Sequence, residues 1–269
     1  MTHHAETAST KVTQGNVSLA NVCKRYPSRT GVKEVLQNVT VDVASQEFVS
    51  IVGASGAGKT TLLRCIAGLQ PVSSGEITMD DVSVTQPPER LGVVFQDYGR
   101  SLFPWMTVGA NVALPLRSQG VPKATAHSAA EEALTAVGLA DTARQYPWML
   151  SGGMQQRVAI ARALAYGPSV LLLDEPFASV DAQTRAELED LVLDIRDKFG
   201  VTTILVTHDI DEAIYVADRV ILLSGRPATI RASIEVELPS PRQHVRTKSD
   251  PLFSALRAEV TQLLGLSSG

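Results

Sequence analysis

The sequence has few cysteines, few aromatic residues and no long hydrophobic run. Two cysteines occur in 269 residues, and aromatic side chains make up 5% of the chain. Cys23 and Cys65 lack the spacing of a metal or redox motif, so they predict reduced, buried thiols of a cytosolic protein. No apolar stretch approaches the ~20 residues that span a bilayer. Residues 1–16 are polar, without the apolar stretch of a signal peptide, and predict a disordered lead-in.

An excess of basic residues is also absent. The net charge is −4 and the isoelectric point is about 5.8. This balance gives no electrostatic footprint for nucleic acid. The hydrophobic fraction of 44% supports a sizeable core in one large domain, or in one domain with an insertion and a tail.

The sequence contains one strong phosphate-binding motif. It follows the apolar strand-like segment Phe48–Val52 and precedes a helical pattern that stops at Gly68. Glycines there let backbone N–H groups surround an anion, and the helix N-terminus adds partial positive charge. The motif and its flank consist of Gly53, Ala54, Ser55, Gly56, Ala57, Gly58, Lys59, Thr60 and Thr61. We expect Lys59 to reach the β- and γ-phosphates of a nucleoside triphosphate and the Thr60 hydroxyl to hold Mg²⁺.

Polar residues follow three other apolar runs at the points where each predicted strand ends. Gln96 follows the run over 91–95, Asp174 and Glu175 end the run from Val170, and His208 follows the run over 201–207. Parallel strands present ligands at their carboxyl ends, so these residues converge on the P-loop. Asp174 is placed to hold Mg²⁺. Glu175 is placed to polarise an attacking water, and His208 to contact that water or the γ-phosphate.

Residues 97–165 interrupt the α/β pattern with helical and irregular sequence. Leu102 is expected in the core of this insertion, whereas Phe103 and Trp105 are expected to meet a partner. Ser151 begins a second helix as its N-cap, and Gly152 and Gly153 leave bare backbone at that helix N-terminus. Either this is a second anion site or it is only a capped helix with a flexible start.

Two further features lie at the ends of the chain. Tyr26 is expected in a polar loop between strands, either as a half-buried surface residue or as a platform for an adenine ring. The tail over 239–269 contains an amphipathic helix that Asp250 caps and Pro251 begins. We expect this helix to pack on its own domain, with a regulatory or dimer contact as the alternative.

Together these motifs resemble the ATP-binding subunit of an ABC transporter over residues 17–238. The resemblance implies an α/β P-loop NTPase fold, the ABC ATPase core, with an antiparallel β subdomain and a helical insertion. It assigns Walker A to 53–60, Walker B to 170–175 with Glu175 as catalytic glutamate, the Q-loop to Gln96 and the switch to His208. Gln96 thereby joins Thr60 and Asp174 around Mg²⁺. Tyr26 becomes the aromatic residue that stacks on adenine.

The resemblance also assigns residues that act across a dimer. Ser151, Gly152, Gly153 and Gln155 belong to the signature, which closes on the γ-phosphate held by a second subunit, and Asp181 belongs to the D-loop at 179–181. The implied assembly is a homodimer, or a pair with another ABC ATPase, at the cytoplasmic face of the membrane. Two permease subunits would dock near 96–105, with a substrate-binding protein as an indirect partner.

Within this family, three stretches resemble the nitrate/sulfonate/taurine importers: Leu102–Trp105, 226–242 and Phe253–Arg257. The resemblance implies ATP hydrolysis coupled to import of such a solute. The alternatives are an importer of a different small organic solute, a soluble ABC ATPase that acts on DNA or ribosomes or as a regulator, and an exporter subunit.

Overall fold

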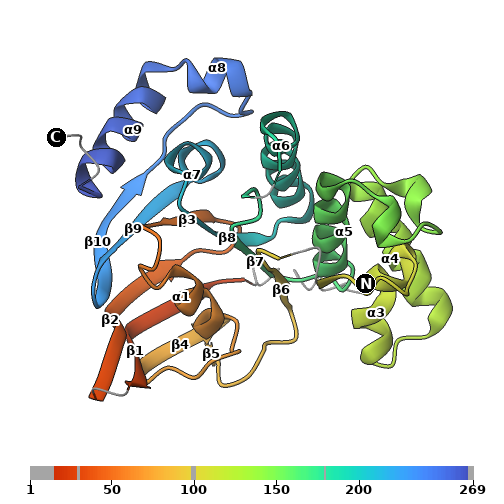
Figure 1. The fold of residues 1–269 in the computed structure, drawn as a ribbon, viewed down its shortest axis with the longest axis horizontal. Coiled ribbons are helices and arrows are strands. Elements are labelled where there is room, and N and C mark those ends of the chain that lie inside the picture. The colour runs from red at the N-terminus through yellow and green to blue at the C-terminus, as the bar shows by residue number, and fades with distance from the viewer. Residues whose placement is uncertain (1–14, 29–30, 98–100, 179, 266–269) are drawn as a thin grey trace, which may run out of the picture.

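One ten-stranded sheet runs through the molecule in the order β5-β4-β1-β2-β10-β9-β3-β8-β7-β6 (Figure 1). The computed structural model describes residues 15–28, 31–97, 101–178 and 180–265. The strands are β1 (Val17–Ser28), β2 (Gly31–Val43), β3 (Phe48–Val52), β4 (Ser74–Met79), β5 (Val82–Ser83), β6 (Leu91–Val94), β7 (Val170–Asp174), β8 (Thr202–Thr207), β9 (Arg219–Gly225) and β10 (Ala228–Glu235).

Helices cover both faces of this sheet. They are α1 (Lys59–Ile66), α3 (Val108–Ser118), α4 (Lys123–Ala136), α5 (Gly152–Leu164), α6 (Ala182–Phe199), α7 (Ile210–Val216), α8 (His244–Lys248) and α9 (Pro251–Leu263). Two 3₁₀ turns, Ala140–Thr142 and Pro147–Met149, precede α5. None of the helices in the described part of the chain is long and apolar enough to cross a membrane.

The half of the sheet from β9 to β6 is parallel, as the continuous apolar runs predict. β3 pairs with β8 and β9, and β7 pairs with β6 and β8. Alternate side chains of β3 enter two separate cores, because successive residues of a strand point to opposite faces. Val49 and Ile51 pack in the same core as α1, whereas Phe48 and Val52 belong to the core of α6 and α7.

The antiparallel subdomain contains a longer hairpin than we expected. β1 and β2 pair along almost their whole length, and β4 pairs with the outer edge of β1. Tyr26 therefore lies in a strand opposite Lys33, and the loop prediction was wrong. Irregularities between Leu19 and Arg25 shift the register and break the apolar–polar alternation from which strands are predicted.

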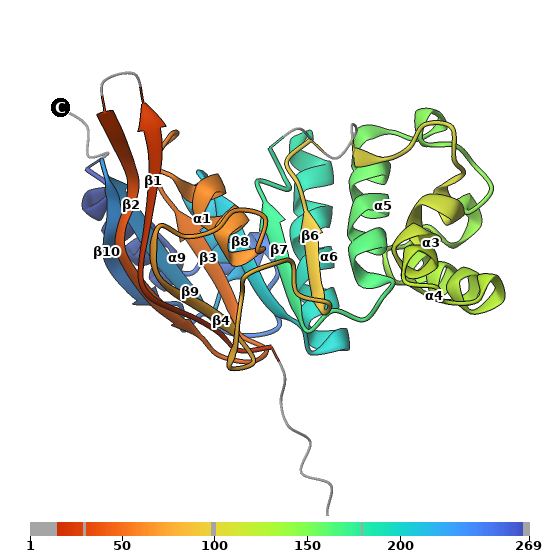
Figure 2. The ribbon, with the colours of Figure 1, turned by 90° about the horizontal axis from the view of Figure 1, so that it is seen from below.

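The helical insertion stands beside the parallel end of the sheet, away from the antiparallel strands (Figure 2). Its predicted apolar face is buried and consists of Ala126, Ala130, Ala133, Leu134 and Val137. Leu102 is buried as expected, while the indole of Trp105 is 72% exposed and its ring centroid lies 5.2 Å from that of Phe103.

Two smaller expectations concern the cysteines and the N-terminus. Cys23 and Cys65 are free and buried, and burial raises the pKa of the Cys65 thiol. The predicted disordered lead-in is two residues too long, because the backbone N–H groups of residues 15 and 16 both donate to Asp80 Oδ1. Residues 1–14 lie outside the described part of the chain.

The C-terminal segment packs on α7 through one apolar face and several cations. Asp250 caps α9, and Phe253, Leu256 and Val260 enter the core that contains α7, as the helical spacing predicts. Arg257 Nε donates to Asp211 Oδ1 over 2.6 Å. The segment thus rests on its own domain in this structure.

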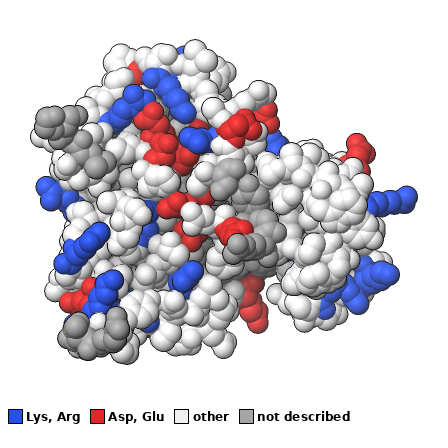
Figure 3. Space-filling view, in the orientation of Figure 1, with Lys and Arg blue, Asp and Glu red and all other residues white. Residues whose placement is uncertain are grey.

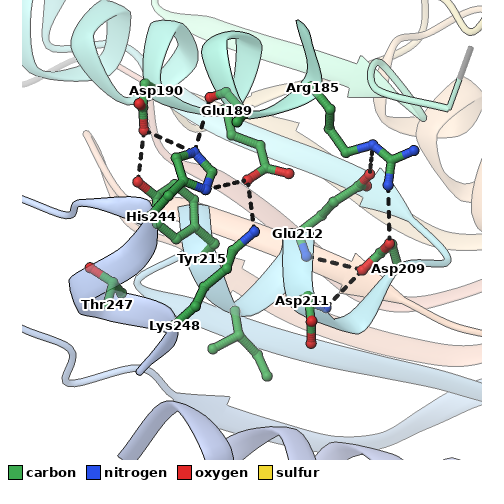
Figure 4. A network of polar contacts seen from close by, with 12 residues as sticks. Arg185, Glu189, Asp190, Asp209, Asp211, Glu212, Tyr215, His244, Thr247 and Lys248 are labelled. Carbon is green, nitrogen blue, oxygen red and sulfur yellow. Dashed lines mark hydrogen bonds and ion pairs between the residues drawn. The ribbon is translucent and has the colours of Figure 1, made fainter. Parts of the chain in front are cut away.

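Two basic side chains of α8 meet a carboxylate on α6 that is 1% exposed (Figure 4). Lys248 Nζ lies 3.4 Å and His244 Nδ1 3.6 Å from Glu189 Oε2. The His244 ring stacks on Tyr215 of α7, whose hydroxyl donates to Asp190 over 2.7 Å. Figure 3 shows acidic and basic side chains interspersed over this part of the surface. α8 therefore joins α6 to α7.

Burial of Glu189 predicts a pH dependence of stability. Burial raises its pKa from 4.5 to about 7, while Lys248 and Arg185 oppose the shift and Asp209 adds to it. The folded state then binds more protons than the unfolded state between these values, so stability present below pH 4.5 is lost as the pH rises through about 7. We expect the melting temperature of Glu189→Gln, relative to wild type, to rise by about 2 °C or more between pH 5.5 and pH 8.

Thermal melts at the two pH values measure this difference. Glu187→Gln is the matched control, because Glu187 lies on the same helix with an exposed side chain. The prediction would be contradicted if the melting temperature of wild type rose relative to that of Glu189→Gln as the pH increases.

Candidate active site

The phosphate loop joins β3 to α1 in the geometry that its glycines require. Gly56 and Gly58 have φ values of 76° and 84°, in the left-handed region that other residues rarely adopt. A Cβ on Gly53 would lie 2.4 Å from the carbonyl oxygen of Leu223 in β9. The loop therefore fits against the sheet only with bare backbone at these positions, and Gly58 begins α1 as its N-cap.

Lys59 and Thr60 turn from the start of α1 toward the end of β7. The Lys59 ammonium donates to the carbonyl oxygens of Gly53 and Ala54 over 2.8 and 3.3 Å. Burial lowers its pKa, and the charges of Glu175 and Asp174 oppose that shift. The site thus holds a cation inside the loop, within reach of a bound anion.

Two oxygen donors lie beside this cation. Thr60 Oγ1 donates to Asp174 Oδ1 over 3.2 Å. Burial raises the pKa of Asp174, and the hydrogen bond from Thr60 is the largest opposing effect. A hydroxyl and a carboxylate at this distance match the oxygen ligands that Mg²⁺ prefers. The residues present therefore fit a magnesium ion next to the phosphate loop.

Glu175 meets the two polar residues, Gln96 and His208, that follow the other predicted strands. Its Oε2 lies 3.3 Å from Gln96 Nε2 and 3.2 Å from His208 Nδ1. Its Oε1 lies 3.9 Å from Lys59 Nζ. The parallel register that pairs Asp174 with Val206 produces this meeting, because it aligns the carboxyl ends of β7 and β8.

The backbone of Glu175 is strained. Its φ is 46°, and its N–H donates to Val206 O over 2.8 Å. A non-glycine residue in the left-handed region costs on the order of 1–2 kcal/mol and is held by its surroundings. Here the hydrogen bond across the sheet aims the carboxylate at the mouth of the phosphate loop.

Tyr26 belongs to β1, and Arg226 lies in the turn between β9 and β10. The Tyr26 ring is half-buried, its hydroxyl donates to Gln70 Oε1, and Lys24 Nζ lies 5.0 Å from the ring centroid. Arg226 Nη2 lies 4.0 Å from the place that a Cβ on Gly56 would take. Sequence reasoning did not place Arg226 near the phosphate loop, because a β-hairpin turn carries no signal for such a neighbour.

The signature residues form a separate site at the start of α5. Ser151 caps the helix, its Oγ accepting from Met154 N over 3.3 Å. A Cβ on Gly153 would lie 2.3 Å from Thr184 Cγ2 on α6. Among the described residues, no hydrogen bond joins 151–153 to the phosphate loop of the same chain.

The side chains of two consecutive glutamines of α5, Gln155 and Gln156, lie against other parts of the same chain. The Gln155 amide donates to Pro147 O and Leu150 O over 3.1 and 3.2 Å. Within its own chain it therefore fixes the turn before the signature. Gln156 is fully buried, and neither atom of its amide has a partner among the described residues. Sequence reasoning did not single out this second residue.

Asp181 begins α6 beside the signature. Its side chain accepts from the backbone N–H groups of Gln183 and Thr184 over 3.1 and 3.0 Å and from the Thr184 hydroxyl over 2.8 Å. These hydrogen bonds from Thr184 hold the Asp181 pKa below its usual range. Ser179 of the predicted D-loop lies outside the described residues.

A glycine loop with a buried lysine, followed by strand-end acids, defines a P-loop nucleoside triphosphatase. The family model for ABC transporters matches residues 36–178, and the chain belongs to that family. It is an ABC ATPase, with the fold expected from its sequence.

Known relatives and structures agree with this assignment. The chain is 41% identical to the nitrate import ATP-binding protein NrtD of Synechocystis sp., over 93% of this chain and 95% of that protein. It is 42% identical to the aliphatic sulfonates import ATP-binding protein SsuB of Bacillus cereus, over 91% and 94%. The dimeric structure of the ATP-binding cassette MJ0796 in a post-hydrolysis state bound to ADP and Pi matches with a TM-score of 0.72 and 33% identity, over 82% and 99%.

Proposed function

We propose that this ATPase works as a dimer beneath two permease subunits and powers import of a small anion of the nitrate or aliphatic sulfonate type. The constellation of Lys59, Glu175 and His208 at one sheet edge supports the ATPase half of this proposal. The functions of the two relatives, nitrate import and aliphatic sulfonate import, support the solute class. An importer of a different small organic solute is the alternative.

In this mechanism the phosphate loop and Tyr26 bind ATP. Backbone N–H groups of 53–61 surround the phosphates, and the Lys59 ammonium exchanges its carbonyl partners for phosphate oxygens. The Tyr26 ring supports the adenine, because its hydroxyl is already fixed by Gln70. Mg²⁺, when bound, neutralises phosphate charge, and Thr60, Asp174 and Gln96 would hold it.

Glu175 accepts the proton of the attacking water as general base. His208 and Gln96 hold its carboxylate in place and contact the γ-phosphate end of the site. Hydrolysis consumes water and releases ADP and phosphate.

The signature completes the same site in a second subunit. Ser151, Gly152 and Gly153 offer backbone N–H groups at a helix N-terminus, and among the described residues no hydrogen bond joins them to the phosphate loop of the same chain. Dimer formation supplies a phosphate ligand, and Asp181 lies beside the signature where two subunits would meet. The solved cassettes with the same fold are described as dimers, which supports this arrangement.

Permease docking near 96–105 has structural support. Trp105 projects from the insertion with most of its indole in solvent. A groove of about 460 Å³ lies next to Gln96, between the insertion and the core, and its lining includes Leu69, Phe95 and Tyr166. Exposed apolar side chains such as Trp105, and grooves with an apolar lining, are typical of protein interaction sites. The ATPase would then lie on the cytoplasmic face of the membrane.

Co-purification and uptake test this proposal. A tagged chain should carry two permease copies from detergent extracts, identified by mass spectrometry, and Trp105→Ser should lower their yield. Cells that lack the chain should lose uptake of nitrate or of an aliphatic sulfonate, and the wild-type chain should restore it. A chain that purifies without a permease would contradict the importer proposal and leave the ATPase assignment intact. A chain that carries a permease, in cells whose uptake of both solutes is unchanged, would contradict the solute class and favour the alternative importer.

A further inference from the structure

Both chain neighbours of His208 are held by side chains at the start of α7. The Thr207 hydroxyl donates to Glu212 Oε2 over 2.7 Å, and it accepts from Asp209 N over 3.0 Å. Asp209 caps α7, its Oδ1 accepting from Asp211 N and Glu212 N over 2.8 and 3.2 Å. The turn that carries His208 is therefore fixed from inside, while the imidazole itself is 58% exposed.

One guanidinium on α6 reaches both of these acids (Figure 4). Arg185 Nη1 lies 3.8 Å from Asp209 Oδ2, and Arg185 Nε lies 3.5 Å from Glu212 Oε1. The Glu212 side chain is 7% exposed. Within the described part of the chain, Arg185 is its one ion-pair partner. A buried carboxylate that loses its cation becomes costly to keep charged, so this contact holds Glu212 and Asp209 in place together.

Arg185 also belongs to the first turn of the helix that Asp181 begins. Its backbone N–H donates to Asp181 O over 2.9 Å. Thr184 immediately precedes Arg185, and Gly153 of the signature helix packs against Thr184. Arg185 thus lies between the residues expected to meet a second subunit and the turn that carries His208.

We propose that Arg185 is a positioning residue for His208: its guanidinium ties Asp209 and Glu212 to α6 and so keeps the imidazole beside Glu175. The inference rests on the proposed role of His208 in ATP hydrolysis. Without this tie the β8–α7 turn is free to shift, and the imidazole leaves its 3.2 Å contact with the Glu175 carboxylate. ATP binding stays, because Lys59 and the phosphate loop do not touch Arg185.

Burial of Glu212 agrees with this geometry. Burial raises the pKa of Glu212 to about 7 and is the largest effect. The hydrogen bond from Thr207 and the charge of Arg185 lower this pKa, whereas the charges of Asp209 and Glu189 raise it further. Loss of the Arg185 charge therefore favours a protonated Glu212. A protonated carboxyl is a weaker acceptor for the Thr207 hydroxyl. Loss of Arg185 therefore also weakens the hydrogen bond between Thr207 and Glu212.

The test compares steady-state ATPase kinetics of the full chain for Arg185→Met, His208→Ala and the double variant. Arg185→Met should lower kcat by about tenfold to a hundredfold, the effect of a misplaced catalytic group, with KM for ATP within about twofold. The double variant should be no slower than His208→Ala, because the two residues act on one contact. Arg185→Lys should recover part of the loss.

Arg257→Met is the matched control. It also removes an ion pair to α7, at Asp211, but that residue does not flank His208. Its kcat should stay at the wild-type value. Should Arg185→Met fold poorly in thermal melts, Thr207→Val replaces it, since it breaks the tie to Glu212 without removing a charge and should lower kcat in the same way.

Wild-type kcat in Arg185→Met, or losses that multiply in the double variant, would overturn the positioning role and leave the proposed function standing. Wild-type kcat in His208→Ala would instead remove the histidine from the mechanism, and the positioning role with it. Ring NMR signals of His208 give a second readout, because they should shift in Arg185→Met and stay unchanged in Arg257→Met.

Discussion

Replacing Glu175 with glutamine lowers ATPase turnover by a factor of about 10²–10⁴, the usual contribution of a general base, while ATP still binds. The amide keeps the size of the side chain and its contacts with Gln96 and His208. It cannot take a proton from water at neutral pH. ATP therefore stays intact in the closed site, and the variant should accumulate as an ATP-bound dimer.

Steady-state phosphate release and size-exclusion chromatography with and without MgATP measure both effects. Glu132→Gln on the exposed face of α4 is the control, and it should hydrolyse ATP at the wild-type rate. Near wild-type turnover in Glu175→Gln would show that another group activates the water. A variant that is inactive and also fails to bind ATP would show that Glu175 is needed for the site to form.

Replacing Lys59 with alanine weakens ATP binding by about 10- to 100-fold, the loss expected for hydrogen bonds between charged groups. The ammonium is buried inside the phosphate loop and lies 3.9 Å from Glu175. Its removal takes away the charge that meets the phosphates. It also removes a positive charge that acts on both Glu175 and Asp174, so the site repels a polyanion more strongly.

Calorimetric titration with MgATP measures the dissociation constant. The control is Lys123→Ala at the exposed start of α4, which should bind ATP as the wild type does. Melting curves without nucleotide show whether each variant is folded. Unchanged affinity in a folded Lys59→Ala would disprove the phosphate-binding role of the loop.

The position of the site was predictable because it depends on where strands end. Apolar runs fixed the strands, and polar residues followed each run. Parallel strands share one carboxyl edge, so residues 79 and 33 positions from Glu175 in the chain could be expected beside it. The glycine loop was predictable because few other arrangements use its spacing.

The rest depends on packing that a linear pattern does not record. Tyr26 lies in a strand whose register shifts remove the alternation that would have revealed it. Arg185 and Glu212 meet only because α6 and α7 pack together, and Lys248 meets Glu189 across 59 residues of chain. Gln155 points inward because carbonyl groups of the preceding turn accept its amide. For each of these side chains the sequence offers many possible charged or polar partners, and no local pattern indicates which one it will contact.

The tight fit of Gly153 against Thr184 changes how substitutions in the signature should be interpreted. Even a methyl group on Gly153 would overlap the Thr184 side chain, so either that side chain or the packing of α5 on α6 would have to shift. A loss of activity in Gly153→Ala would then report a displaced helix pair as much as a lost phosphate contact. A Gly153→Ala, Thr184→Ser double variant would separate the two causes, because the serine lacks the methyl group that meets the new Cβ.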